Sequence, residues 1–318
     1  MTPPRPIVSV IVPHLNQPAL LEHCLSSLDH QTLDRASFEV LVVDNGSVQP
    51  PLGVIDKHPM TRLLEEKQPG PGIARNRGVR EAAGTVLAFI DADCRAHPDW
   101  LKSGLDALAA SEAHTALGGD VQIWRDRKDR FTATEAYESV FAYRFKLYIE
   151  QHGFSGTGNL LVRRADFDRV GPFEGIQVAE DMDWGRRALE AGCNFRFVPG
   201  MIVYHPARRS IGELFVKWDR HLQHAANISD GTIAWKARWI ARAFAVLASP
   251  AADWPKVVFA DRLPGLSSKA KALGVLAAVR AYRFWRMLTL LHSNNGVIWN
   301  RQGQAIRPDE AGPNSQGG

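Results

Sequence analysis

The stretch Val86-Leu87-Ala88-Phe89-Ile90-Asp91-Ala92-Asp93 decides how this chain is interpreted, because an apolar run is followed at once by two carboxylates. Five uninterrupted apolar residues are typical of a parallel strand buried on both faces. In open α/β sheets, ligands bind beyond the carboxyl ends of the strands. A hard divalent cation needs only one or two protein carboxylates when substrate phosphates complete its shell. Asp91 and Asp93 are therefore candidate cation ligands, with a plain Asp-rich turn as the alternative.

The segments around this stretch alternate between strand and helix patterns. Apolar runs predict three more N-terminal strands, at residues 7–12, 38–43 and 62–65, and apolar spacing predicts helices at 20–28 and 72–83. This rhythm predicts an α/β fold with a mainly parallel twisted sheet flanked by helices. Farther along, we expect strands at 116–124, 159–162 and 195–204, helices at 100–110 and 183–192, and mainly helix over 211–291. Four aromatic residues at helical spacing are interpreted as core: Tyr137, Phe141, Phe145 and Tyr148.

Composition excludes several classes of protein. Hydrophobic residues make up 45% of the 318 residues and charged residues 23%, which excludes collagen, coiled coil and wholesale disorder. Three scattered cysteines argue against a disulfide framework and fit a reducing compartment. No apolar stretch precedes Ile7, and the apolar run at 243–252 has half the length of a membrane span, so we expect a cytoplasmic protein.

Charge is distributed unevenly. Residues 233–301 carry 11 Lys and Arg against 2 Asp and Glu, together with five of the nine Trp. We expect a catalytic domain over 1–230, a basic, Trp-rich helical extension over 231–301 and a disordered tail over 302–318. The extension is interpreted as a peripheral membrane module at the inner face of the plasma membrane, where basic residues meet anionic lipid. One such helix would include Ala272, Val275, Leu276, Val279, Tyr282, Arg283 and Arg286. The alternative is that these helices pack on the catalytic domain; no nucleic-acid motif accompanies the charge.

Two further polar motifs follow predicted strands. Asp44-Asn45-Gly46-Ser47 offers a carboxylate to a nucleobase or ribose, with an ordinary turn as the alternative. Arg75 and Asn76 lie near a predicted helix N-terminus, where phosphate is favoured; surface arginine is the alternative. Pro13-His14-Leu15-Asn16 stands where a Gly-rich dinucleotide fingerprint would follow the first strand, which disfavours a nicotinamide-dependent dehydrogenase.

Two motifs in the second half also carry chemistry. Glu180 and Asp181 open a predicted helix, where acids favour the macrodipole, and a carboxylate there could act as a general base for a hydroxyl nucleophile. His205, at a predicted strand end, could ligate a metal, although such a histidine is more often structural.

The order of these motifs, together with Gly156-Thr157-Gly158-Asn159, resembles the family 2 glycosyltransferases of the GT-A fold over residues 6–220. The resemblance implies that Asp91-Ala92-Asp93 is the DxD motif, that Asp93 binds Mn²⁺ or Mg²⁺ and that Asp91 contacts the ribose. It implies that His205 completes the metal site, that Asp44 reads the base, and that Asp181, beside Glu180, is the catalytic base. It further assigns the nucleotide to Pro13, Asn16, Asp44, Ser47, Arg75, Asn76, Asp91 and Ala92, and the acceptor or donor sugar to Gly156, Thr157, Gly158, Asn159, Asp183 and Trp184.

The implied activity is inverting, metal-dependent transfer of a sugar from a nucleotide-diphosphate donor, with UDP-sugar expected, to a hydroxyl on a glycan or lipid-linked acceptor. Bacterial cell-surface polysaccharide or glycolipid assembly is the implied setting. His14 departs from the family's first motif. Lys217-Trp218-Asp219-Arg220-His221 only loosely matches the Gln-x-x-Arg-Trp motif of processive synthases, which argues for non-processive transfer. A non-catalytic sugar-nucleotide-binding protein and a metal-dependent phosphohydrolase remain as alternatives.

Overall fold

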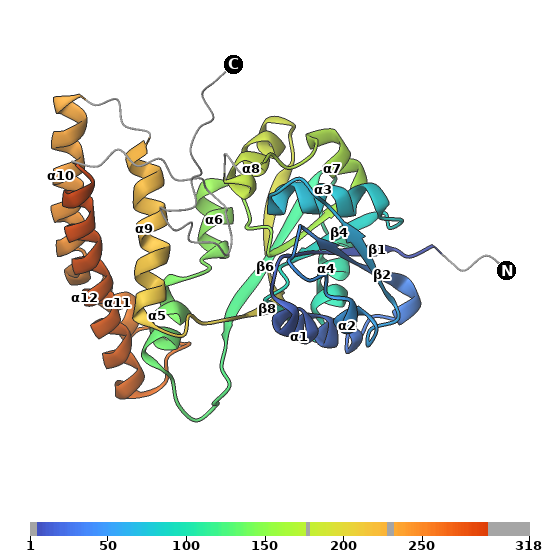
Figure 1. Ribbon diagram of the computed structural model, residues 1–318, viewed down its shortest axis with the longest axis horizontal. Helices are drawn as coiled ribbons and strands as arrows, with labels where there is room; N and C mark the ends of the chain where they lie inside the picture. Colours follow the sequence, from blue (N-terminus) through green and yellow to red (C-terminus); the bar gives the residue numbers. More distant parts are fainter. Residues whose placement is uncertain (1–4, 176–178, 228–231, 292–318) are drawn as a thin grey trace, which may run out of the picture.

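A computed structural model describes residues 5–175, 179–227 and 232–291. An eight-stranded sheet runs through its centre, with the strand order β3-β2-β1-β4-β7-β6-β8-β5 (Figure 1). The strands are β1 (Val8–His14), β2 (Phe38–Asp44), β3 (Thr61–Glu65), β4 (Val86–Ile90), β5 (Arg95–Ala96), β6 (Thr115–Trp124), β7 (Asn159–Arg163) and β8 (Asn194–Pro206).

The N-terminal half of the sheet is parallel, as the apolar runs predict. β2 lies between β1 and β3, and β1 lies between β2 and β4, all parallel. His14 is level with Asp44, and Ile11 is level with Phe89. Because parallel strands end at the same edge, the residues after β1, β2 and β4 meet there. The three predicted motifs at 13–16, 44–47 and 91–93 therefore share one edge of the sheet.

The other half of the sheet is mixed and brings distant segments together. β7 is antiparallel to β4 and β6, whereas β8 is parallel to β6. The short strand β5 pairs antiparallel with the end of β8, with Arg95 opposite Tyr204. This pairing places the residues just before β5, Asp93 and Cys94, beside His205 at the end of β8.

Helices cover both faces of the sheet. The helices α1 and α4 pack on one face, where Leu21, Leu25 and Trp100 join the strand residues in a buried cluster. The helices α3, α7 and α8 pack on the other face around Phe89 and Trp184. The helices of this part are α1 (Pro18–Asp29), α2 (Leu52–Ile55), α3 (Pro71–Glu81), α4 (Trp100–Ala109), α5 (Ala133–Phe141), α6 (Phe145–His152), α7 (Arg164–Val170) and α8 (Glu180–Glu190).

Four further helices stand beside the α/β part: α9 (Ile211–Asn227), α10 (Ile233–Ala248), α11 (Pro250–Val258) and α12 (Gly265–Leu290) (Figure 1). The predicted helical character of this region is confirmed within the described residues. None of the helices in the described ranges combines the length and the apolar composition that a bilayer crossing requires. The expected tail at 302–318 lies outside the described residues.

The residues of α12 that were assigned to a membrane surface are engaged inside the protein. Its apolar side is buried against α5, α9 and α11 and comprises Ala272, Val275, Leu276 and Val279. Arg280 pairs with Asp253 at 2.9 Å, and Arg286 pairs with Asp219. The Arg283 guanidinium lies 3.8 Å from the centroid of the Trp218 ring. For this helix the sequence pattern of interleaved apolar and basic residues reflects internal packing, so the membrane interpretation of these positions was wrong.

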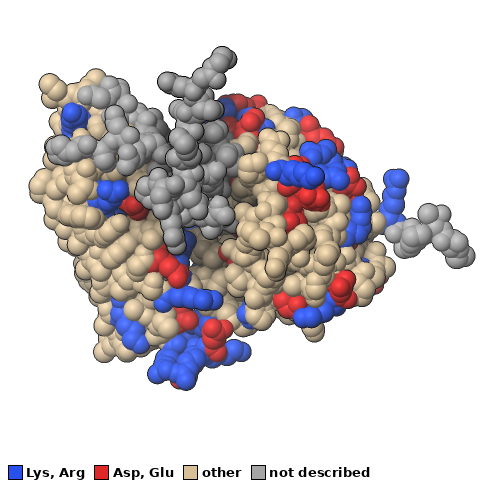
Figure 2. All heavy atoms as spheres, in the orientation of Figure 1, with Lys and Arg blue, Asp and Glu red and all other residues tan. Residues whose placement is uncertain are grey.

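The helix α10 behaves differently. Trp239 faces inward, only 4% exposed, and its indole N–H donates to the carbonyl of Met287 at 2.8 Å. Another side of the helix carries exposed apolar residues spaced 7, 4 and 3 positions apart, which places them on one face. We call this set the α10 apolar stripe: Ile233, Ile240, Phe244 and Leu247. Lys236, Arg238 and Arg242 on the same helix are exposed. In Figure 2 the part of the molecule over α10 and α12 is largely uncharged, with scattered basic side chains.

Candidate active site

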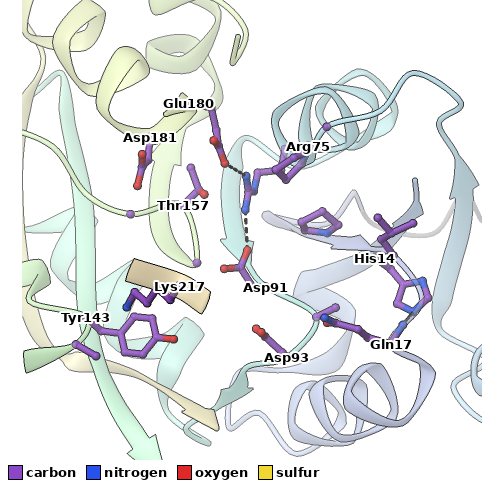
Figure 3. Close-up of a pocket in the computed structure, with 18 of the residues that line it drawn as sticks. His14, Gln17, Arg75, Asp91, Asp93, Tyr143, Thr157, Glu180, Asp181 and Lys217 are labelled. Carbon is purple, nitrogen blue, oxygen red and sulfur yellow. Dashed lines mark hydrogen bonds and ion pairs between the residues drawn. The ribbon is translucent and has the colours of Figure 1, made fainter. Parts of the chain in front are cut away.

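A cavity of about 560 Å³ opens at the shared edge of β1 and β4, and residues of α9 and of the α5–α6 connection line its other side (Figure 3). Such a volume fits a small-molecule ligand. Many of the predicted site residues line it: Pro13, Arg75, Asp91, Ala92, Asp93, Gly156, Thr157, Gly158, Glu180 and Asp181.

Arg75 organises two of the carboxylates. Its guanidinium is 3% exposed and donates to Asp91 Oδ1 at 2.7 Å and to Glu180 Oε1 at 3.0 Å. Its Nε has no hydrogen-bond partner among the described residues. Charge-assisted bonds of this kind hold both acids in place. Arg75 therefore lines the cavity as a bridge between the two acids.

Gly158 makes room for Asp91. A Cβ added at Gly158 would lie 2.6 Å from Asp91 Oδ2, well inside van der Waals contact. Since Arg75 already holds the other oxygen of Asp91, the carboxylate has little freedom to move away. Glycine at this position of the 156–159 loop is thus required by the placement of Asp91.

Asp93 and His205 form a candidate metal centre. Asp93 Oδ2 lies 3.2 Å from His205 Nε2, and ligand atoms of Asp93, Cys94 and His205 all lie within 4.8 Å of one another. His205 Nδ1 lies 2.6 Å from the carbonyl of Pro206, so a proton on Nδ1 leaves the lone pair of Nε2 directed to Asp93. One carboxylate and one imidazole, with phosphate oxygens to complete the shell, suit Mn²⁺ or Mg²⁺. The residues present fit such an ion.

The thiol of Cys94 does not belong to this ligand set. Burial raises its pKa well above the ordinary value, and the negative charges of Asp93 and Asp91 raise it further. The protonated thiol donates to Asp93 Oδ1 at 3.7 Å. Carboxylate oxygen and imidazole nitrogen suit Mn²⁺ and Mg²⁺ better than sulfur does, so Cys94 is assigned a supporting contact with the carboxylate.

Asp181 is a carboxylate of altered acidity at the cavity. Burial raises its pKa to about 6, and the neighbouring Glu180 charge adds to the effect. Its Oδ1 accepts the backbone N–H of Met182 at 2.8 Å, which fixes the side chain in the first turn of α8. In Figure 3 Asp181 points into the cavity next to Thr157. A carboxylate of this kind can exchange a proton near neutral pH.

The first two strand-end motifs build a hydrogen-bonded turn. Asp44 is 4% exposed, and its carboxylate accepts the hydroxyl of Ser47 at 2.6 Å and contacts His14 Nδ1 at 2.9 Å. The Asn16 side chain accepts the N–H of Val48 at 2.9 Å. Asn16, Asp44 and Ser47 do not line the cavity; His14, Gln17 and Asn45 line it instead. Asp44, expected to read the base, here anchors the turn that carries those three neighbours.

Four other predicted residues hold the fold and do not line the cavity. Asn76 exchanges two hydrogen bonds with the backbone of Phe173, at 2.8 and 2.9 Å. Asn159 is fully buried and bonds to Trp100 and to the carbonyls of Asp120 and Met201. Trp184 packs among Phe167 and Phe173, and Asp183 pairs with Arg186 and Arg187.

Sequence reasoning missed the wall of the cavity opposite the acids. The chain breaks between α5 and α6, where Tyr143 has a φ of 48°, so that one predicted helical array becomes two helices. Tyr137 and Phe145 are core as predicted, and Phe145 lines the cavity together with Phe141 and Tyr148. Tyr143 also lines it, and its hydroxyl lies 2.9 Å from His205 Nε2. Further missed residues come from α9: Lys217, Trp218 and His221.

Comparisons with known proteins agree with this fold and site. A mannosyltransferase from Pyrobaculum calidifontis, solved with GDP-Man and Mn²⁺, superposes with a TM-score of 0.56 at 22% identity, covering 91% of this chain and 87% of that one. The fold is therefore of the GT-A glycosyltransferase type. The family model "Glycosyl transferase family 2" matches residues 9–171, and this chain belongs to that family.

The similarity to two curated relatives covers more of this chain than the family model does. The glycosyltransferase AglE of Haloferax volcanii is 34% identical over 223 residues, which is 68% of this chain and 72% of AglE. A validoxylamine A glucosyltransferase of Streptomyces hygroscopicus subsp. jinggangensis is 34% identical over 262 residues, and the match covers 70% of this chain and 58% of that protein. These matches confirm the family to which the strand-end motifs pointed.

Proposed function

We propose that this glycosyltransferase moves one sugar per cycle from a nucleoside diphosphate to a hydroxyl group, with inversion at the anomeric carbon. The observation that carries the proposal is Asp181, a carboxylate with a raised pKa that faces the cavity across from Asp91 and Asp93 and, in the described part of the chain, makes no ion pair with Arg75. Base and leaving-group machinery on opposite sides of one cavity suit direct displacement, and direct displacement inverts the carbon.

Asp181 takes the proton of the acceptor hydroxyl as the oxygen attacks. A pKa of about 6 leaves the carboxylate ionised at pH 7 and makes it a stronger base than an ordinary aspartate. Glu180 accepts a hydrogen bond from Arg75, which also holds Asp91. This contact fixes the first turn of α8 beside Asp91. Thr157 and Gly158 form the floor on which the donor sugar lies.

Asp93 and His205, with Asp91 alongside, would hold a divalent cation, which stabilises negative charge on a departing diphosphate as a Lewis acid. The complex of the Pyrobaculum mannosyltransferase with Mn²⁺ and GDP-Man supports Mn²⁺ or Mg²⁺ here and a nucleotide-sugar donor. We retain UDP-sugar as the expected donor, with GDP-sugar as the comparison in the experiment.

The test is a screen of UDP- and GDP-sugars with Mn²⁺ or Mg²⁺, read as release of nucleoside diphosphate, followed by NMR of the product anomer. Asp181→Asn should bind the nucleotide as the unmodified protein does and lose transfer by about 100-fold or more, because it removes the proton acceptor with little change in shape. Asp168→Asn is the matched control, since Asp168 is exposed on α7. Near-normal transfer by Asp181→Asn, or a product that retains the donor configuration, would overturn the proposal.

We further propose that the acceptor is lipid-linked and that the enzyme meets it at an anionic membrane surface, in polysaccharide or glycolipid assembly. The α10 apolar stripe supports this, because several large apolar side chains lie exposed along one helix with basic residues beside them. Helices of that composition bind in the headgroup plane.

A further inference from the structure

The wall of the cavity formed by α9 is cationic. Lys217 and His221, one helical turn apart, both line the cavity. Burial and the nearby positive charges lower the pKa of His221 to about 4. The positive charge of this wall therefore comes from Lys217, Arg220 and Arg208. In Figure 3 Lys217 lies on the other side of Asp91 and Asp93 from His14 and Gln17. The cavity therefore has a carboxylate side and a basic side.

Lys217 differs from Arg208 and Arg75, which are both paired with acids. Arg208 is paired with Glu138, and Arg75 is paired with Asp91 and Glu180. Within the described ranges Lys217 makes no ion pair and no hydrogen bond; its ammonium lies 5.9 Å from the centroid of the Tyr143 ring. The ammonium of a cavity-lining lysine without an ion-pair partner is available to an anionic ligand.

The electrostatic surroundings of Lys217 also favour the binding of an anion. Burial lowers the pKa of Lys217 to about 8, and the charges of Arg208 and Arg220 lower it further, with Glu138 acting in the opposite direction. The protein thus holds a positive charge on this wall at a cost that an anion would offset.

We propose that Lys217 binds a phosphoryl oxygen of the substrates, on the side of the cavity away from the nucleoside. The inference rests on the proposed function, in which at least one substrate carries phosphate. A lysine ammonium binds phosphate as a point charge and needs no fixed fork geometry. Two sources share this chemistry: the terminal phosphoryl group of the donor diphosphate, and a phosphate that links an acceptor to its lipid.

The experiment compares Lys217→Met and Lys217→Arg with the full-length protein by calorimetry in Mg²⁺. Lys102→Met is the matched control, because it removes one exposed positive charge from α4. The probes are UDP, UMP, and dodecyl phosphate added to protein saturated with UDP. GDP and GMP replace UDP and UMP if the unmodified protein prefers guanine. Thermal unfolding of each variant verifies that it is folded.

Each outcome has a distinct meaning. If Lys217 binds the donor, Lys217→Met weakens UDP by about tenfold and leaves UMP unchanged, and Lys217→Arg restores part of the affinity. If Lys217 binds the acceptor, UDP is unchanged and dodecyl phosphate is weakened by about tenfold. If the folded Lys217→Met variant binds all probes as Lys102→Met does, the inference is overturned while the proposed function stands. If the unmodified protein binds neither UDP nor GDP, both the inference and the proposed function are overturned.

A pH series gives a second measurement. Between pH 7 and 9 the unmodified protein should lose affinity for the probe that Lys217 contacts, because the lysine loses its proton in that interval. Lys217→Arg should keep its affinity there, since an arginine stays charged. Parallel curves for the two proteins would contradict the assignment.

Discussion

Asp181 and Asp183 lie two positions apart on α8 and have opposite acidities for local reasons. Burial and the Glu180 charge raise the pKa of Asp181 to about 6. Burial also acts to raise the pKa of Asp183, but the hydrogen bonds and charges of Arg187 and Arg186 together outweigh it and lower that pKa. Two positions along one helix thus separate a carboxylate that can act as a base from one that is neutralised by its partners.

Stability measurements can separate a catalytic Asp181 from a structural one. Because the folded protein holds the pKa of Asp181 above its unfolded value, ionisation destabilises the fold, and the penalty develops as pH rises from about 4 to about 6. Asp181→Asn should therefore raise the free energy of unfolding at pH 8, by at most about 3 kcal/mol. The difference should vanish below pH 4, where both states are protonated. Denaturant titrations at pH 8 and pH 3.5 make the comparison; a destabilised variant at pH 8 would contradict it.

The rate of transfer should depend on the ionisation of Asp181. The rate at limiting donor and acceptor should fall as pH drops through about 6, because the base becomes protonated. The pH profile of kcat/KM is the measurement, with Asp168→Asn as the control. A profile that stays flat from pH 7 to pH 5 would place the base elsewhere.

Asp93 permits a direct test of metal-dependent nucleotide binding. Asp93→Asn removes the carboxylate that faces His205 at 3.2 Å and should weaken nucleotide binding in Mn²⁺ by about tenfold or more, with the fold intact. Calorimetry with and without the metal is the measurement. Equal affinity in the two conditions, for the unmodified protein, would contradict a cation at Asp93 and His205.

At the scale of elements, two glycines of the loop at 156–159 make room for Phe145 and Asp91. Gly156 faces Phe145, with 2.3 Å to an added Cβ, and Gly158 faces Asp91. The break between α5 and α6 brings Phe145 to this loop and directs Tyr143 at His205. The site therefore depends on how closely a strand-end loop and a helix pair approach each other.

Gly158→Ala tests this dependence. The added methyl group should displace Asp91 from Arg75 and weaken nucleotide binding by about tenfold, at a cost in stability of about 1–3 kcal/mol. Gly274→Ala on α12 is the control, because nothing lies within 4 Å of its Cβ and alanine favours a helix. Unchanged affinity in Gly158→Ala would show that the Asp91 position is not needed for the nucleotide.

At the scale of the whole molecule, the α/β part and the C-terminal helices share buried clusters. Tyr137 of α5 packs with Leu214 of α9 and Val275 of α12. A truncation near residue 230 would expose these residues to water, so loss of membrane binding after truncation would not identify a surface. Substitutions confined to exposed side chains are the better test.

The test of the membrane surface uses vesicles with half anionic lipid. The full-length protein should sediment with them at low salt and be released at high salt, because the attraction to basic residues is screened. Ile240→Ser combined with Phe244→Ser and Leu247→Ser should abolish sedimentation. Leu52→Ser with Met60→Ser, two exposed apolar residues of the α/β part, is the control. Equal binding by the two variants would exclude the α10 apolar stripe.

The sequence by itself determined the strands and the chemistry placed at their ends. Runs such as 86–90 are buried on both faces, so their apolar composition is a local record of their environment. The motifs at 91–93, 156–159 and 180–181 therefore stood where a cavity would form, and their order sufficed to indicate the family.

Only the tertiary structure decided what completes the cavity. Asp93 and His205 meet because β5 pairs with β8, and Lys217 lines the cavity because α9 packs against α5 and α12. The same packing places aromatic residues of 141–148 on the cavity wall. It also pairs two arginines of α12 with aspartates of other helices. Contacts between residues a hundred positions apart depend on how whole elements pack. The type of a residue and its spacing along the chain carry no record of that packing.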